Sequence, residues 1–250
     1  MLVNTNGGTL LAGKANLTNE VTMTNEVTTY EEMLKAQAVE AAKSERPLVS
    51  SISLKSGQIA YGGNPIPGNS LDCIIAASTH ANFFYDKKWK PDTISAPACY
   101  AYSATGKGMK PHPASTNPQH ETCEGCPNNE WGSAAEGDGK ACKNQRVLAL
   151  VTPDGGEEVA ILKVPVTSVK NYSDYVNKVS TLFSRSLNGL ITTISAEPHK
   201  KTQFKLIFSN GPLLDATVGA PILARLPKFM PLIEREYEVE DEAPEKARKM

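Results

Sequence analysis

Long apolar segments are missing from this chain of 250 residues. No apolar run reaches the ~18 residues that a membrane-spanning helix needs, and the N-terminus lacks the basic and then apolar stretch of a secretory signal. The net charge is −1, which excludes a globally basic nucleic-acid-binding protein but permits a local basic face. We therefore expect a cytoplasmic protein with no membrane partner.

The motifs of several enzyme classes are missing as well. The sequence around Lys107 lacks the GxxxxGK[ST] spacing of a phosphate-binding loop. Neither a GxSxG nucleophile elbow nor an HExxH helix is present, and no H-x-E precedes the CxxC as a zinc deaminase requires. These absences predict a protein that is not an enzyme.

Cysteine is scarce, with five residues, but four of them are grouped. Cys123 and Cys126 form a CxxC, and Cys99 and Cys142 lie on either side of it. Four such ligands make the tetrahedron that structural zinc prefers, so we predict a structural Zn²⁺. Four thiolates leave no coordination position open for water, which argues against catalysis by the metal. The fifth residue, Cys73, lies in an apolar run and is expected to be a buried thiol.

Other interpretations of the four cysteines stay open. Disulfides rarely persist in a reducing compartment, and a redox CxxC expects a strand-to-helix setting. Gly125 and Pro127 favour a loop at this position instead. His112 and His120 are possible substitutes for a cysteine ligand.

The hydrophobic pattern predicts a mainly β protein with flanking helices (α+β). Expected strands cover 48–54, 58–61, 71–79 with a continuation toward 85, 146–152, 157–165, 190–196 and 203–208, and expected helices cover 28–43, 168–183 and parts of 213–237. This number of short strands suggests an OB-like antiparallel barrel, with an α+β sandwich as the alternative.

The composition divides the chain into three parts. Residues 1–27 are rich in Thr, Asn and Gly and predict a flexible arm. Residues 28–233 are expected to form the OB-like nucleic-acid-binding domain. Within it, the range 86–145 has little regular pattern and predicts a zinc-binding insertion, because ligand bonds can replace a missing core. Residues 234–250 form a charged, mostly acidic tail.

Aromatic residues make up only 6% of the chain, yet several alternate with cations around the cysteines. Rings that stack on bases beside cations that contact phosphates are typical of single-stranded nucleic-acid binding. The predicted stacking residues are Tyr85, Trp89, Tyr102 and Trp131, the predicted phosphate contacts are Lys87, Lys88, Lys90, Lys107, Lys143 and Arg146, and the secondary contacts are Lys163 and Lys170. Two alternatives are that Trp131 covers the metal loop and that the lysines form a solvated face.

Several strings resemble a group of tailed-bacteriophage proteins described as single-stranded-DNA-binding proteins. These strings are Pro65-Ile-Pro-Gly-Asn69, Pro97-Ala-Cys99-Tyr-Ala, Cys123-x-x-Cys126-Pro-x-Asn-x-Trp131-Gly-Ser, Gly139-Lys-Ala-Cys142-Lys-Asn-x-Arg146 and Leu162-Lys-Val-Pro165-Val-Thr-Ser-Val-Lys170. More distantly, the chain resembles the single-stranded-DNA-binding proteins of T-even phages, whose zinc ligands are three Cys and one His. The resemblance implies binding and protection of single-stranded DNA in phage replication or recombination, with replication proteins recruited by the acidic tail. The alternative function is a protein-interaction adaptor of the phage replication or transcription machinery.

Overall fold

The computed structural model describes residues 30–35, 37, 49–87, 95–200 and 202–237. The chain divides into two compact units, 1–46 and 47–250. The boundary lies inside the range 28–233 that the sequence predicts as one domain.

In the first unit, the described residues 30–35 and 37 are helical, as the capping pattern predicts. The predicted arm 1–27 and residues 238–250 of the predicted tail lie outside the described residues.

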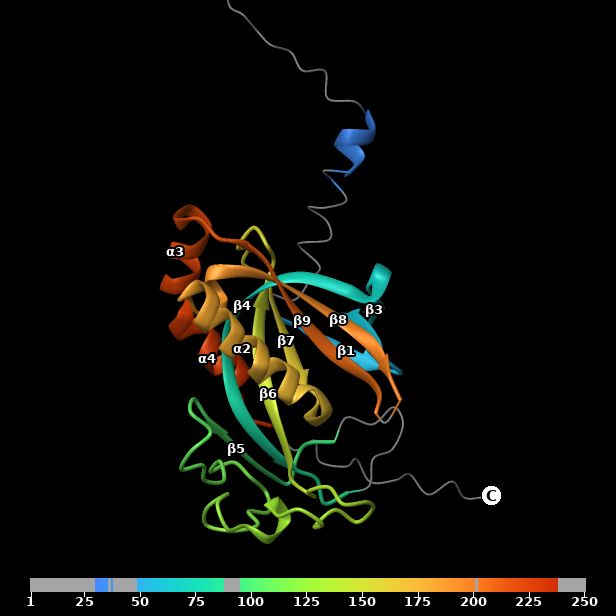
Figure 1. The fold of residues 1–250 in the computed structure, drawn as a ribbon, viewed down its shortest axis with the longest axis vertical. Helices are drawn as coiled ribbons and strands as arrows, with labels where there is room; N and C mark the ends of the chain where they lie inside the picture. The colour runs from blue at the N-terminus through green and yellow to red at the C-terminus, as the bar shows by residue number, and fades with distance from the viewer. Residues whose placement is uncertain (1–29, 36, 38–48, 88–94, 201, 238–250) are drawn as a thin grey trace, which may run out of the picture. The chain divides into compact units, whose positions relative to one another are not determined.

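In the described part of the second unit, nine strands form one mixed sheet (Figure 1). The strands are β1 Val49–Lys55, β2 Gln58–Tyr61, β3 Asn64–Pro65, β4 Ser70–Phe84, β5 Cys99–Ser103, β6 Lys143–Val151, β7 Val159–Val164, β8 Leu190–His199 and β9 Gln203–Leu213. Their order is β3-β2-β1-β7-β6-β4-β8-β9, and β5 pairs with β4. The helices are α2 Val169–Phe183, α3 Ala216–Ala224 and α4 Leu226–Ile233, with 3₁₀ turns η1 Pro67–Asn69, η2 Pro127–Asn129, η3 Val166–Ser168 and η4 Leu187–Gly189.

The mainly β prediction with flanking helices is confirmed, and the sheet is curled into a half-barrel (Figure 1). The sheet is mixed, however, and the prediction of a purely antiparallel one is wrong. The exception is β1, which pairs in parallel with β7, from Val49 opposite Val159 to Ile52 opposite Leu162. Parallel neighbours need a long connection, and the chain supplies one by building β2 to β6 before it returns as β7.

The long strand β4 is buried on both faces and divides the core into two clusters. Ile75 belongs to the cluster under α2, which contributes Tyr172 and Val179, and the adjacent Ile74 belongs to the cluster under α3 and α4, which contribute Ile222 among others. Successive side chains of a strand point to opposite faces, so both faces of β4 require an apolar cover. None of the helices in the described ranges is long and apolar enough to cross a membrane.

Asn69, at the end of η1, joins the β1–β2 hairpin to β8. Its side-chain Oδ1 accepts a hydrogen bond from the Ile59 N–H at 2.7 Å, and its Nδ2 donates to the carbonyls of Gly57 at 2.8 Å and Ala196 at 3.0 Å. Its φ of 53° lies in the left-handed region, which Asn adopts more readily than most residues. One side chain therefore holds the curled ends of the sheet together.

The edge of β4 that faces away from β6 is paired only at its two ends. β8 pairs with residues 70–73, and β5 pairs with residues 80–84. Among the described residues, no strand pairs with 74–79 on this edge. The ladder to β6 on the other edge contains a bulge between Ile75 and Ala77. Residues 75–78 of this unpaired stretch line a cavity beside α2.

Candidate metal centre and nucleic-acid interface

The four predicted zinc ligands line one small cavity of about 20 Å³. Cys99 begins β5 and Cys142 directly precedes β6, so two strands next to β4 bring these two thiols to the same end of the sheet. Cys123 and Cys126 reach it from the loop between those strands. Cys123 is half-buried and the other three are buried.

Backbone hydrogen bonds hold this cysteine loop in place without a core of its own. The Cys123 N–H donates to the Met109 carbonyl and the Cys142 N–H donates to the Asn128 carbonyl, both at 2.8 Å. The 3₁₀ turn η2 begins with a proline directly after Cys126, and its last N–H donates back to the Cys126 carbonyl at 2.8 Å. The irregular backbone thus satisfies its polar groups locally.

The thiols influence one another electrostatically. Burial raises the pKa of Cys142 to about 12, and the neighbouring thiols Cys123, Cys99 and Cys126 raise it further in the same direction. Burial is likewise the main cause that raises the pKa of Cys99 and of Cys123. The raised pKa values favour the neutral form of the Cys99, Cys123 and Cys142 thiols at physiological pH.

Two observations on these residues differ. The shared cavity and the mutual pKa effects place the four sulfur atoms near one another, and their chemistry suits zinc. Yet among the residues that the structure describes, no group of three or more His, Cys, Asp or Glu side chains is placed so that it could hold a metal ion. The four cysteines thus share one cavity, but in the described structure their side chains are not arranged to coordinate a metal ion. The zinc assignment stays a prediction.

The two histidines suggested as substitute ligands occupy different places. His120 lines the cysteine cavity. His112 stacks on the ring of Tyr100, with centroids 4.8 Å apart and planes 15° apart, and its Nδ1 accepts a hydrogen bond from the Ala114 N–H at 3.2 Å. Of the two, only His120 is therefore positioned beside the cysteines.

Trp131 stands out on the cysteine loop because 77% of its side chain is exposed. The loop backbone after it is fixed by the Gly132 N–H, which donates to the Asp138 and Gly139 carbonyls at 3.2 and 3.0 Å. The Lys140 Nζ lies 5.7 Å from the centre of the indole ring, and the exposed Lys143 donates through its Nζ to the Lys140 carbonyl at 3.0 Å. We call Trp131, Lys140 and Lys143 the Trp131 surface. Lys140 is absent from the predicted contacts, although its position three residues before Lys143 is a usable signal.

Two other predicted stacking residues have intramolecular partners. The Tyr102 hydroxyl donates to the Arg235 carbonyl at 3.0 Å, and its ring makes a T-shaped contact with Phe83 at 6.0 Å. Burial and the neighbouring Tyr237 raise the pKa of Tyr102. Tyr85 is 37% exposed, and burial with Tyr237 raises its pKa to about 12. Both rings therefore lie near the last described residues of the chain.

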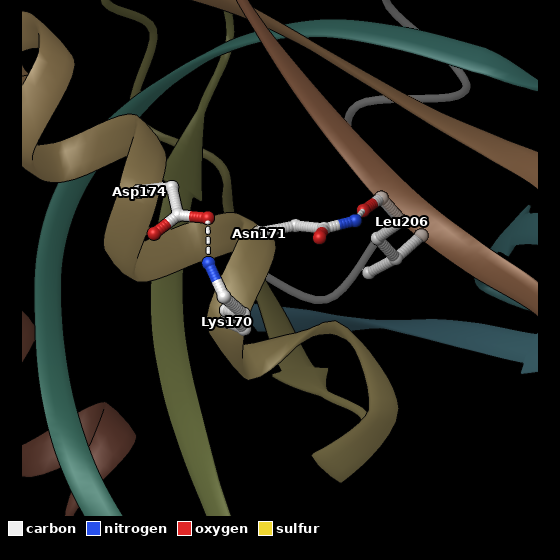
Figure 2. A network of polar contacts seen from close by, with 4 residues as sticks. All are labelled: Lys170, Asn171, Asp174 and Leu206. Atoms are coloured by element: carbon white, nitrogen blue, oxygen red, sulfur yellow. Dashed lines mark hydrogen bonds and ion pairs between the residues drawn. The ribbon is translucent and has the colours of Figure 1, made fainter.

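The two secondary phosphate contacts are also engaged within the protein. The Lys163 Nζ lies over the rings of Phe83 and Tyr237, 4.8 Å from each centre. On α2, Lys170 pairs with Asp174 at 2.6 Å (Figure 2).

Figure 2 also shows the next residue of α2, Asn171, whose Nδ2 donates to the Leu206 carbonyl at 2.9 Å and ties α2 to β9. Of the other predicted contacts, Lys87 and Lys107 are exposed, and Lys88, Trp89 and Lys90 lie outside the described residues.

Arg146 lies in a larger cavity of about 880 Å³ between the sheet and α2. It is opposite His80 in the β4–β6 ladder, and Arg185 lines the same cavity from the segment after α2. The sequence analysis missed His80 and Arg185. The only sequence signal for His80 is its place in the alternating pattern of β4, and the only one for Arg185 is its position after a predicted helix. The tertiary structure places both in the lining of the cavity that contains Arg146.

The chain has no match among protein-family models, curated proteins or solved structures. The resemblance to phage single-stranded-DNA-binding proteins therefore stays a prediction.

Proposed function

We propose that the protein binds and protects single-stranded DNA during phage DNA replication or recombination. In this proposal the curled sheet is an OB-like barrel, and a structural zinc bound by Cys99, Cys123, Cys126 and Cys142 stabilises the loop that carries the Trp131 surface. The observation that carries the proposal is the 77% exposure of Trp131 beside the Lys140 ammonium group.

An exposed indole on a fixed backbone is suited to stacking on a base. Each base stacked on an aromatic ring contributes about 1–3 kcal/mol by alanine substitution, and this contribution depends little on base identity. Lys140 and Lys143 place positive charge next to the ring, where the phosphates of a stacked strand would lie. The combination favours binding without sequence preference.

The charge of the loop limits how strong this binding can be. Glu130, Glu136 and Asp138 are exposed in the same loop, so only a few phosphates can be neutralised there. If Lys107, Lys140 and Lys143 each contact one phosphate, the logarithm of the affinity should fall with the logarithm of the salt concentration with a slope of about −2. A shallow slope therefore distinguishes this surface from an extended basic groove.

Zinc would act on the loop and not on the DNA. When bound, a structural zinc supplies folding free energy, apparent values being about 10–16 kcal/mol in small zinc modules. Bound to the four cysteines, it would tie together the start of β5, the loop that precedes Trp131 and the start of β6. Its contribution to DNA binding is to fix the position of the Trp131 ring.

The test is a titration of labelled oligo(dT) with the protein at low salt, in which the fluorescence anisotropy of the oligonucleotide reports binding. Trp131→Ala should weaken binding by about 5- to 150-fold, which corresponds to one stacked base, and Trp131→Phe should retain most of the affinity. Leu223→Ala is the matched control, because Leu223 is an apolar side chain of α3 that is 52% exposed. Equal affinities of Trp131→Ala and the unmodified protein would remove the Trp131 surface from the interface. If the unmodified protein does not bind below about 10 µM oligonucleotide at low salt, the adaptor function is favoured.

A further inference from the structure

A cavity of about 880 Å³ lies where β4 lacks a strand partner, and we call it the β4–α2 cavity. Its walls are residues 75–78 of β4, one side of α2 and the segment from 184 to 188. Its volume is within the range of about 300–1,000 Å³ that small-molecule sites occupy. Unlike most clefts of this size, it has part of a strand edge in its wall.

The charges around the β4–α2 cavity have one sign. His80, Arg146 and Arg185 line it, and among the described residues no Asp or Glu does. Arg146 is half-buried, and its Nη1 donates to the Gln145 carbonyl at 3.2 Å. In the described part of the chain, Arg146 has no ion-pair partner, whereas buried charges in proteins are usually paired. The half-buried Arg146 guanidinium therefore lies in a cavity with no acidic side chain among its described lining residues.

His80 and Arg146 are neighbours in this lining and influence each other. Burial, and then the charge of Arg146, lowers the pKa of His80, so the two groups act on each other across the β4–β6 ladder. Gly106 packs so closely on the His80 ring that a Cβ at this position would be 2.5 Å from its Cδ2. The loop after β5 therefore restricts the position of the His80 ring.

The rest of the lining offers both hydrogen bonds and apolar surface. Ser78, Ser173 and Ser180 line the cavity together with the apolar residues Ile75 and Val176, and the Ser78 hydroxyl also hydrogen-bonds to the Tyr172 side chain. The strand edge adds main-chain N–H and C=O groups that no other strand in the described ranges uses. An anionic group, a polar edge and a flat apolar face could all be bound here at once.

We propose that the β4–α2 cavity binds one nucleotide, with its phosphate between Arg146 and Arg185 and its base against the unpaired edge of β4. A guanidinium group is a planar fork that matches phosphate oxygens in a bidentate manner. The serine hydroxyls add donors for the remaining oxygens. The nucleotide can be free or part of a DNA strand, so the inference goes beyond the Trp131 surface and does not require it.

Calorimetric titration of the full chain tests this proposal with thymidine monophosphate, thymidine, inorganic phosphate and a 5′-phosphorylated oligo(dT). Arg146→Gln and Arg185→Gln should each weaken binding of the monophosphate by about 10- to 100-fold, the size of a lost charged hydrogen bond. Lys178→Gln is the matched control, since Lys178 is an exposed cation of α2 that does not line the cavity. Arg185 is exposed, so its variant remains informative if Arg146→Gln fails to fold.

The ligand series separates the possible results. Binding of the monophosphate that both arginine variants weaken supports a free nucleotide as the ligand. Binding of the phosphorylated oligonucleotide alone, with the same loss in both variants, supports a nucleotide within a strand. Equal binding of thymidine and its monophosphate, unchanged affinities in both arginine variants, or no binding of any nucleotide would overturn the proposal. Trp131→Ala should weaken oligonucleotide binding without affecting the monophosphate, so failure of the cavity is distinguishable from failure of the proposed function.

Discussion

Replacing Asn69 with alanine should destabilise the sheet by about 3 kcal/mol. The change removes three hydrogen bonds between the Asn69 side chain and the backbone of Ile59, Gly57 and Ala196. Each contributes about 0.5–1.5 kcal/mol net, or about 1.5–4.5 kcal/mol together. Alanine must also adopt the φ of 53°, which adds about 1 kcal/mol of backbone strain. The three backbone groups are only partly buried, so water replaces some of the lost bonds and a value near the middle of this range is expected.

Urea denaturation followed by circular dichroism measures this loss, and for a chain of this size ~3 kcal/mol corresponds to a decrease in Tm of about 6–12 °C. Asn69→Asp is the matched variant, because it keeps the shape and the left-handed preference of Asn. It places a carboxylate against the carbonyls of Gly57 and Ala196, which raises the pKa of the new Asp in the folded state. Its stability relative to the unmodified protein should therefore be lowest near neutral pH and recover as the pH falls toward about 4. A loss below about 0.5 kcal/mol for Asn69→Ala would show that this side chain does not hold the curled sheet together.

Three further predictions concern the sites. Cys126→Ser should abolish stoichiometric zinc measured by atomic absorption and lower the Tm, because one of the four proposed ligands is lost; an unchanged zinc content would refute the assignment. Lys163→Met should cost about 0.5–2 kcal/mol in urea denaturation, because its ammonium group contacts two rings, and a large loss of DNA affinity with unchanged stability would instead identify it as a phosphate contact. Nucleotide binding should strengthen as the pH falls below the ordinary His value of about 6.5, because protonation of His80 adds a third positive charge to the lining that includes Arg146 and Arg185. The lowered pKa of His80 puts this increase below its usual titration range, and His80→Asn should abolish the pH dependence seen by calorimetry.

The periodicity of the sequence predicted most elements of the second unit. The apolar run at 71–79 and its continuation became β4 Ser70–Phe84, and the helical stripe at 168–183 became α2 Val169–Phe183. Both elements were predictable because the hydrophobic pattern of a single segment indicates which of its side chains are buried. The parallel pairing of β1 with β7 depends on long-range packing and left no local signal.

The strand β5 shows the same limit. Its five residues, Cys99–Ser103, lie in a segment rich in Gly and Pro, which the sequence predicted to lack regular structure. The alternation of Tyr100 and Tyr102 is a weak strand signal, and what establishes the strand is its pairing with the end of β4. The β4–α2 cavity was not predictable for a related reason, because His80, Arg146 and Arg185 come from three elements.

The cysteine loop and the β4–α2 cavity are connected by β5. The first residue of this strand, Cys99, lines the cysteine cavity, and its last residue, Ser103, is opposite His80 in the ladder with β4. An unpaired strand edge is normally covered or blocked, because it can pair with another chain. Here β5 pairs only with residues 80–84 of β4, and α2 lines the cavity beside residues 75–78 without pairing to them. If the cysteines bind zinc as proposed, the metal would fix where β5 begins, and with it the length of β4 that stays unpaired on this edge.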